Sequence, residues 1–263
     1  MSAGPKAREV RAARAARAGW LHHTLRLAAL LLLCTVALQL VFAARIALMI
    51  VLDPQSTTFQ RSEARRLLVD KQQILWSQTW VAQDRIAPAL KRAVIASEDA
   101  GFGAHGGVDW KAIETAWGRN QRAEQHAERL ALRQPARPVA AKVVGGSTIT
   151  QQLAKNLFLS GERTVPRKAQ ELVLTLMLET LLSKQRILEI YLNNVEWGEG
   201  VFGAQAAARH YFRVDAARLN VTQAARLAVL LPAPKRYERS PGSAFIIGRA
   251  ATIVARMDDV VLP

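Results

Sequence analysis

The longest apolar block of the chain lies near its N-terminus. Residues 27–44 contain no charged side chain and one amide, Gln39, and the apolar character continues after Arg45 to Leu52. A helix of about 20 apolar residues crosses a bilayer, so the pattern predicts one transmembrane helix over residues 24–52. A cleavable signal peptide is the alternative. The length of the block and the lack of a clean small-x-small cleavage site disfavour it.

Beyond this block, the hydrophobic positions follow the period of a helix rather than the alternation of a strand. Ile86, Leu90 and Val94 recur on one side of residues 86–97, and Pro88 falls in the first turn, where proline is tolerated. Further helices are predicted over residues 110–117, 166–182, 183–192, 204–212, 222–231 and 244–257. We therefore predict a mainly α fold with one short strand at most.

Three segments lack a sustained apolar face. Residues 53–80 are polar and mixed, and we expect a membrane-proximal lead-in there. Residues 119–142 are rich in Arg, Ala and Gln and contain two prolines, which predicts a mobile loop or a partly helical flap. Residues 193–203 form a predicted glycine-rich loop that carries Glu196 and Trp197.

The distribution of charge orients the predicted membrane helix. Residues 1–26 carry six basic side chains against one acid, a net charge of +5. Positive charge beside a span stays on the cytoplasmic side. This predicts a cytoplasmic tail over residues 1–23 and an extracytoplasmic domain over residues 53–263. An arginine-rich segment can also bind nucleic acid, but beside a membrane span the topological interpretation is stronger.

The whole chain has a net charge of +15, so +10 remains beyond residue 26. For a domain outside the cytoplasm, the anionic partners are phospholipid head groups and phosphorylated lipids, and no nucleic acid is expected. The single cysteine, Cys34, lies in the predicted span, so no intramolecular disulfide can form. No cluster of cysteine and histidine has the spacing of a zinc site, and no metal ligand is predicted.

Two adjacent carboxylates, Glu98 and Asp99, follow the helix over residues 86–97. A glycine-broken segment with Phe102 and His105 comes next. A carboxylate at the end of an apolar helix can lie in a cleft that is partly shielded from water, where it can act as a general acid or a general base. Solvated acids at an ordinary helix C-terminus would give the same pattern, so these residues alone do not decide between the two.

A second block, residues 145–156, opens with two glycines. Thr148 and Gln151 fit a capping box, and the glycines leave the N-terminus of the helix open to a ligand. One side of the helix carries Thr148, Gln151, Gln152 and Lys155. These amides and the lysine, with no acid among them, favour a polar, anionic ligand, although an ordinary amphipathic helix has the same spacing.

Basic residues gather before and at the start of the helix over residues 166–182. Arg163, Arg167 and Lys168 precede Glu171, which lies on the polar stripe of a helix that is apolar nearly all round and therefore predicted to be buried. Cations at the start of a helix oppose its dipole, so an anionic ligand explains them better than helix stability does. The alternative is that Glu171 is simply paired with a neighbouring cation, because an unpaired buried charge is very costly.

Five segments together resemble the peptidoglycan glycosyltransferases of family 51, and within it the monofunctional biosynthetic transglycosylases. In the family's order, they are Glu98-Asp99-x-x-Phe102-x-x-His105-x-Gly107-x-Asp109, residues 145–156, Arg167-Lys168-x-x-Glu171, residues 184–193 and residues 198–212. The similarity extends over residues 56–257. No S-x-x-K or K-T-G motif of a transpeptidase follows.

The resemblance implies a lysozyme-like helical fold and an enzyme of the bacterial inner membrane. That enzyme would polymerise lipid II into glycan strands, inverting the anomeric carbon and releasing undecaprenyl diphosphate. By the family's pattern, Glu98 is the general base and Glu171 the second essential carboxylate. The diphosphate would be stabilised by Lys155, Arg163, Arg167 and Lys168. The cleft would be shaped by Asp99, Phe102 and His105, and its sugar and phosphate sites lined by Thr148, Gln151, Gln152 and Asn156.

Two other functions stay open from the residues alone. A lysozyme-like hydrolase or lytic enzyme acting on finished glycan could use the two carboxylates, but it would also need a general acid and would have little use for four cations. A non-catalytic, membrane-anchored binding module is the other, and the intact motif residues count against it. A divalent cation, Mg²⁺ or Mn²⁺, could assist the diphosphate, and other cell-wall synthesis proteins could be partners. The sequence decides neither.

Overall fold

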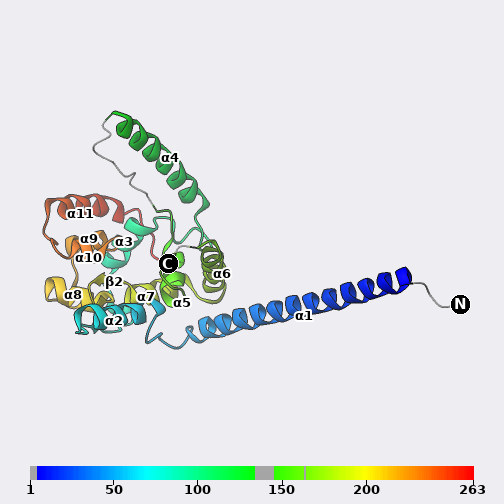
Figure 1. Cartoon of the computed structure of the whole chain (residues 1–263). Coiled ribbons are helices and arrows are strands. Elements are labelled where there is room, and N and C mark those ends of the chain that lie inside the picture. The colour runs from blue at the N-terminus through cyan, green and yellow to red at the C-terminus, as the bar shows by residue number, and fades with distance from the viewer. Residues whose placement is uncertain (1–4, 134–144, 163) are drawn as a thin grey trace. The chain divides into compact units, whose positions relative to one another are not determined.

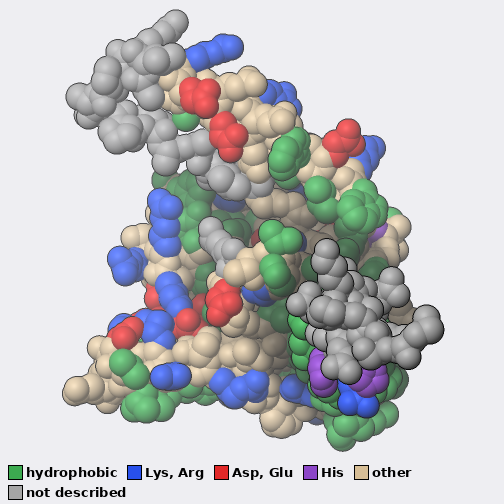
Figure 2. Space-filling model, turned by 45° about the vertical axis from the view of Figure 1, so that its right-hand side comes forward, with side chains coloured by type: hydrophobic (Ala, Val, Ile, Leu, Met, Phe, Trp, Pro, Cys, Tyr) green, Lys and Arg blue, Asp and Glu red, His purple; other side chains and the backbone are tan. Residues whose placement is uncertain are grey.

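The computed structural model describes residues 5–133, 145–162 and 164–263, and the chain divides into two compact units, Met1–Leu48 and Met49–Pro263. The first unit is a single long helix, α1 (Pro5–Leu48), drawn in blue in Figure 1. Its part His22–Leu48 contains an 18-residue window with a mean hydropathy of 2.5, and among the described residues it alone is long and apolar enough to cross a membrane. In the part of this helix that Figure 2 shows in colour, green hydrophobic side chains lie beside purple histidine and blue basic side chains. The helix ends at Leu48 rather than at the predicted Leu52, and turns follow it.

The second unit is built mainly from helices, which confirms the prediction of a mainly α fold. Along the chain its elements are α2 (Thr58–Lys71), β1 (Ser77–Gln78), α3 (Pro88–Glu98), α4 (Trp110–Arg133), α5 (Ile149–Phe158), α6 (Val165–Leu181), α7 (Lys184–Asn194), β2 (Glu196–Gly198), β3 (Val201–Phe202), α8 (Ala204–Phe212), α9 (Val221–Leu230), α10 (Pro234–Tyr237) and α11 (Ala244–Met257), with short 3-10 turns at Gln83–Arg85 and Ala216–Arg218.

The helices α3, α9 and α11 pack against one another and form one part of the core (Figure 1). Leu90 and Val94 of α3 are fully buried, and so are Ala224 and Ala228 of α9. The small alanine side chains allow the backbones of α3 and α9 to approach closely at the density of a protein interior. This packing fixes the orientation of α3 and therefore the position of its last residue, Glu98.

The helix α5 lies at the centre of the other part of the core, where it contacts α2, α6 and α7. Ile149, Leu153 and Leu157 on one of its sides are at most 1% exposed, as their spacing predicted. The opposite side carries Gln152, which is half-buried, and Lys155, which is exposed. The helix therefore buries its apolar side together with Gln151 and Asn156, and it turns Gln152 and Lys155 toward the solvent.

Residues 53–80 are not the simple lead-in that the sequence predicted, because they contain α2 and β1. Thr57 caps α2 and forms a capping box with Gln60, and both side chains are buried. Leu67 on the same helix is also buried. The polar composition hid an element of the core, because its buried polar groups satisfy one another by hydrogen bonds.

The segment 193–203 is likewise not a plain loop. It contains β2 and β3, which pair antiparallel, and β1 joins β3 in parallel to give the order β1-β3-β2. Gly200 has a φ of +73°, and a Cβ there would lie 2.0 Å from the carbonyl oxygen of Leu75, so this position requires glycine. The strands have two or three residues each, too few for an alternating pattern to appear in the sequence.

The helix α4 continues to Arg133, far beyond the predicted end at residue 117. The first part of the segment 119–142, predicted as a loop or a partly helical flap, is therefore regular helix, and its part after residue 133 lies outside the described residues. Figure 1 shows α4, in green, standing out from the other helices of this unit. The polar composition that suggested a loop is that of a solvated helix.

The prediction that α6 is buried all round is wrong. Leu172, Val173 and Leu176 are 36%, 38% and 49% exposed, whereas Leu174 and Leu178 are fully buried. The buried side of α6 also includes its polar stripe, because Glu171 and Thr175 have almost no exposed surface. The helix therefore turns a polar stripe inward and part of its apolar surface outward.

Candidate active site

Glu98, the last residue of α3, is held by two hydrogen bonds. Gln152 Nε2 donates to Glu98 Oε2 at 3.0 Å, and Ser97 Oγ donates to Oε1 at 3.4 Å. Burial raises the pKa of Glu98 and the charge of Asp99 adds to this, whereas the two hydrogen bonds and the charge of Arg249 act in the opposite direction. A carboxylate with a raised pKa beside a groove is suited to accept a proton near neutral pH.

Asp99 uses both of its carboxylate oxygens to join two parts of the site. Oδ2 accepts the backbone N–H of Ile149 at 3.0 Å, and Oδ1 lies 2.8 Å from His105 Nε2. His105 Nδ1 accepts the N–H of Gly107 at 3.1 Å, so the ring proton lies on Nε2 and is donated to Asp99. Burial raises the pKa of Asp99, and the contacts with His105 and Ile149 oppose that increase. Asp99 thus ties the loop after α3 to the N-terminus of α5.

The capping box predicted at the start of α5 is present. Gln151 N–H donates to Thr148 Oγ1 at 3.2 Å, and Thr148 N–H donates to Gln151 Oε1 at 3.1 Å. The Thr148 hydroxyl in turn donates to the carbonyl of Gly107 at 2.6 Å. Gly107 has a φ of +87°, and a Cβ there would lie 2.7 Å from the side chain of Thr175. The polar groups of Thr148, Gln151 and Gly107 are therefore mainly hydrogen-bonded to one another, and these bonds support one side of the site.

Glu171 is buried and paired with two cations of its own helix. Arg167 Nη1 lies 2.9 Å from Glu171 Oε2, and Lys168 Nζ forms an ion pair with Oε1. The pairing with neighbouring cations, which the sequence left as an alternative, is thus present. Arg167 Nε is buried and has no hydrogen-bond partner among the described residues. An unsatisfied buried donor is costly, and the oxygen of an anion would satisfy it.

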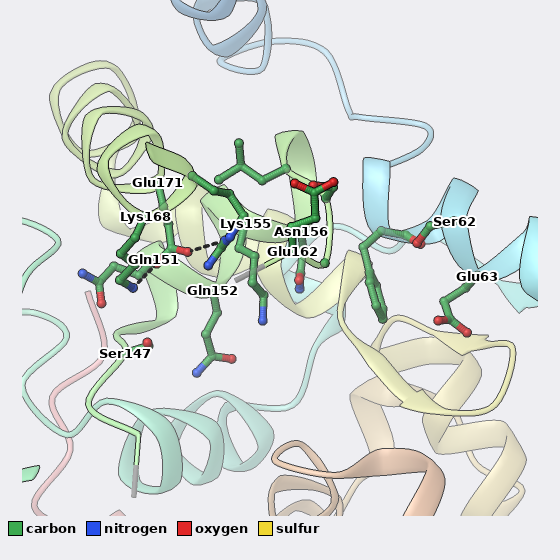
Figure 3. Close-up of a pocket in the computed structure, with 15 residues that line it drawn as sticks. Ser62, Glu63, Ser147, Gln151, Gln152, Lys155, Asn156, Glu162, Lys168 and Glu171 are labelled. Carbon is green, nitrogen blue, oxygen red and sulfur yellow. Dashed lines mark hydrogen bonds and ion pairs between the residues drawn. The ribbon is translucent and has the colours of Figure 1, made fainter. Parts of the chain in front are cut away.

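These cations line a cavity of about 450 Å³, which we call the cationic pocket. Figure 3 shows it between Ser62 and Glu63 of α2 on one side and the side chains of α5 and α6 on the other. Its polar lining includes Ser147, Gln151, Gln152, Lys155, Asn156, Arg167, Lys168 and Glu171. The carboxylates Glu63, Glu162 and Glu171 line this cavity together with Lys155, Arg167 and Lys168. The three basic side chains supply positive charge for a polyanionic group such as a diphosphate.

A second hollow of about 540 Å³, which we call the aromatic groove, contains Glu98. Its lining comprises Ser97, Glu98, Arg119, Gly145, Ser147, Gln152, Val229, Pro232, Tyr237, Phe245 and Arg249. Ser147 and Gln152 also line the cationic pocket, so the two hollows meet at these side chains. A third hollow of about 450 Å³ contains both Glu98 and Asp99. The acid and the cations therefore face connected cavities.

Some residues expected in the site lie elsewhere. Phe102 is fully buried with Lys184 Nζ 4.5 Å from the centre of its ring, and it lines none of the three hollows. Its side chain therefore supports the loop from within the protein. Arg163 lies outside the described residues. Within the described part of the chain, no group of three or more His, Cys, Asp or Glu side chains has a geometry that could hold a metal ion.

Several side chains of the site were not predicted from the sequence. Tyr191 OH donates to Gln152 Oε1 at 2.9 Å and so orients the amide toward Glu98. Tyr191 lies in one of the segments that carry the family resemblance, but its spacing alone does not distinguish it. Tyr237, Phe245 and Arg249 carry no sequence signal, because only the packing of α9, α10 and α11 brings them to the groove.

Comparisons with known proteins identify the family of this chain. A family profile described as transglycosylase matches residues 69–258. Three relatives bear the name biosynthetic peptidoglycan transglycosylase. The protein of Bordetella avium is 50% identical over 211 residues, 80% of this chain and 83% of the relative. That of Paraburkholderia phytofirmans is 45% identical over 251 residues, 95% of this chain and 98% of the relative. That of Burkholderia pseudomallei is 50% identical over 227 residues, 86% of this chain and 82% of the relative.

The match covers the candidate site from Glu98 at the end of α3 to Arg249 on α11, whereas Ser62 and Glu63 of the cationic pocket precede the matched residues. Profile and relatives agree in naming a transglycosylase, and the three relatives align over 82–98% of their length. The chain therefore belongs to the transglycosylase family.

Proposed function

We propose that this chain is a membrane-anchored peptidoglycan glycosyltransferase that joins lipid II units into glycan strands, with Glu98 as its general base. The observation that carries the proposal is the connection between two hollows. Glu98 lies in one, the cations Lys155, Arg167 and Lys168 lie in the other, and Gln152 lines both. The names of the relatives support the same activity.

The proposed reaction replaces a diphosphate on the anomeric carbon of one sugar by the 4-hydroxyl of another. The hydroxyl gives its proton to Glu98 as the new bond forms, and the bond to the diphosphate breaks on the opposite face, which inverts the carbon. The leaving group needs its negative charge stabilised more than it needs a proton, and Lys155, Arg167 and Lys168 supply positive charge for this. Glu171 holds two of these cations in place.

For the location of the protein, we propose that His22–Leu48 spans the bacterial inner membrane, with the basic residues before it in the cytoplasm and residues 53–263 in the periplasm. The apolar length of this segment and the excess of basic residues before it support this orientation. Protease added to spheroplasts should degrade residues 53–263. Their protection in intact spheroplasts would contradict the orientation.

The proposed base is tested by Glu98→Gln in the full-length protein with purified lipid II. The variant keeps the size of the side chain but cannot accept a proton, so we expect polymerisation to fall by about 10²–10⁴-fold with an unchanged unfolding temperature. Glu114→Gln on α4 is the matched control, because this carboxylate is exposed and lines none of the three hollows. Activity of Glu98→Gln close to that of the wild type would refute the assignment.

A further inference from the structure

The aromatic groove has a feature that the proposed reaction does not use. Tyr237 of α10 and Phe245 of α11 stack with their ring centres 5.6 Å apart and an angle of 24° between the rings. Phe245 is 56% exposed, although it is a large hydrophobic side chain. Exposed aromatic surface within a groove is characteristic of a binding site rather than of a core.

The aromatic pair shares its hollow with the proposed base. Glu98 and Gln152 line the same groove as Tyr237, Phe245 and Arg249. None of the three cations of the cationic pocket lines this groove. The two hollows therefore differ on either side of their shared residues. Three cations and three carboxylates line one, whereas two aromatic rings, Arg119 and Arg249 line the other beside Glu98.

A glycan polymerase must bind two chemically different parts of its substrate. The diphosphate needs cations, whereas sugar units further along a strand have no phosphate and present an apolar face of C–H groups with polar groups at the edges. Aromatic rings bind such a face by burying it. Arg249 at the same wall can donate hydrogen bonds to hydroxyl, acetamido or carboxylate oxygens.

We infer that Tyr237 and Phe245 form a saccharide subsite, which holds sugar units of the glycan strand in the aromatic groove while the diphosphate occupies the cationic pocket. This inference rests on the proposed function and extends it to the part of the strand that does not react. A strand bound by additional sugar units leaves the enzyme less often between additions. The subsite should therefore influence the length of the product.

A binding experiment tests the subsite without catalysis. The probe is an octasaccharide of alternating N-acetylglucosamine and N-acetylmuramic acid without lipid or phosphate, titrated into the full-length protein in detergent. We expect the wild type to bind it, and Phe245→Ala, alone or with Tyr237→Ala, to weaken binding about tenfold. Absence of binding by the wild type, or undiminished binding by both variants, would overturn the inference.

The chain offers matched controls for this experiment. Ile247 lies on the same helix as Phe245 and is also 56% exposed, but it does not line the groove, so Ile247→Ala should bind the octasaccharide like the wild type. Lys168→Ala in the cationic pocket should also bind it normally, because the probe has no phosphate. A loss of binding by Ile247→Ala equal to that of Phe245→Ala would contradict a specific aromatic subsite.

Polymerisation of lipid II gives an independent readout. Phe245→Ala should release strands several-fold shorter than those of the wild type, because the variant binds the growing strand more weakly. Strands of normal length would contradict the inference. Failure of the wild type to polymerise lipid II would refute the proposed function instead. The octasaccharide titration would still test the saccharide subsite, because it does not depend on catalysis.

Discussion

The side-chain amide of Gln152 donates a hydrogen bond to Glu98 Oε2 at 3.0 Å, so the acid at the end of α3 and the polar side of α5 are directly joined. Tyr191 fixes the orientation of this amide, because its hydroxyl donates to Gln152 Oε1 at 2.9 Å. Tyr191 is fully buried, and burial raises its pKa well above the ordinary value, so it stays protonated and keeps donating. The NH₂ group of Gln152 is therefore directed at the carboxylate.

Replacement of Gln152 by methionine should leave less of Glu98 ionised and ready to accept a proton. Gln152→Met keeps the length of the side chain but removes the hydrogen bond that stabilises the ionised carboxylate, so we expect kcat/KM for lipid II to fall by about 10–100-fold at neutral pH. Initial rates of polymerisation measure this effect. Gln185→Met on the exposed surface of α7 is the control and should leave the rate unchanged. An equal loss in both variants would contradict the role of Gln152.

The pH dependence of polymerisation should reflect the environment of Glu98. Burial raises the pKa of this carboxyl, so activity should appear only at pH values above those at which an ordinary glutamate ionises. The positive charge of Arg249 opposes this increase, so Arg249→Met should move the acidic limb of the profile to still higher pH. The exposed Arg239 lines none of the three hollows, and Arg239→Met should not move the limb. A shift of the limb to lower pH in Arg249→Met would contradict the proposed electrostatics.

Arg167 should be important for the departure of the diphosphate. Its Nη1 pairs with Glu171 while its buried Nε has no hydrogen-bond partner among the described residues, so a phosphate oxygen would complete its contacts. We expect Arg167→Gln to lower kcat/KM by about 10²–10³-fold. Arg167→Lys should recover little of this, because an ammonium group cannot reproduce the geometry of a guanidinium. Full activity of Arg167→Lys in the lipid II assay would show that positive charge alone is sufficient.

A buried acid away from the site should make the stability of the protein depend on pH. Glu196 is 6% exposed, and burial raises its pKa to about 7, with the charge of Lys235 opposing and that of Glu63 adding to the increase. A carboxyl with a raised pKa stabilises the folded state at low pH, and this contribution is lost as the pH rises through about 7. The free energy of unfolding should therefore decrease by about 1–3 kcal/mol between pH 5 and pH 8.

Glu196→Gln tests this directly by chemical denaturation at both pH values. The variant cannot ionise, so it should match the wild type at pH 5 and exceed it at pH 8. Glu114→Gln, which removes an exposed carboxylate, should retain the decrease seen in the wild type. An equal decrease in Glu196→Gln and the wild type would assign the pH dependence to other groups.

The helices with a strong hydrophobic period were predictable, and the elements with a polar composition were not. The apolar positions of α3, α5 and α11 repeat at the helical spacing, and the predicted bounds 204–212 and 244–257 agree with α8 and α11. By contrast, α2 and the second half of α4 were missed. Their polar side chains either accept backbone N–H groups, as those of Thr57 and Gln60 do in the capping box, or lie in solvent.

The candidate site was predictable to the extent that its residues are close in sequence. Arg167 and Lys168 lie within one turn of Glu171, and a single helix is enough to bring them together. The aromatic pair is different, because Tyr237 and Phe245 reach the groove of Glu98 only after α11 has packed against α3 and α10 against β2. No local pattern records such an arrangement. Conversely, the sequence could not show that Phe102 points into the core rather than into the cleft.

The two bonds of Asp99 have a consequence for how the enzyme meets its substrate. One oxygen holds the first turn of α5 and the other holds the loop after α3 through His105, so the helices that carry Gln152 and Glu98 are braced against each other at their nearest ends. The reacting groups are thus set in place when the chain folds, and no reorganisation is required of them when a lipid-linked sugar arrives.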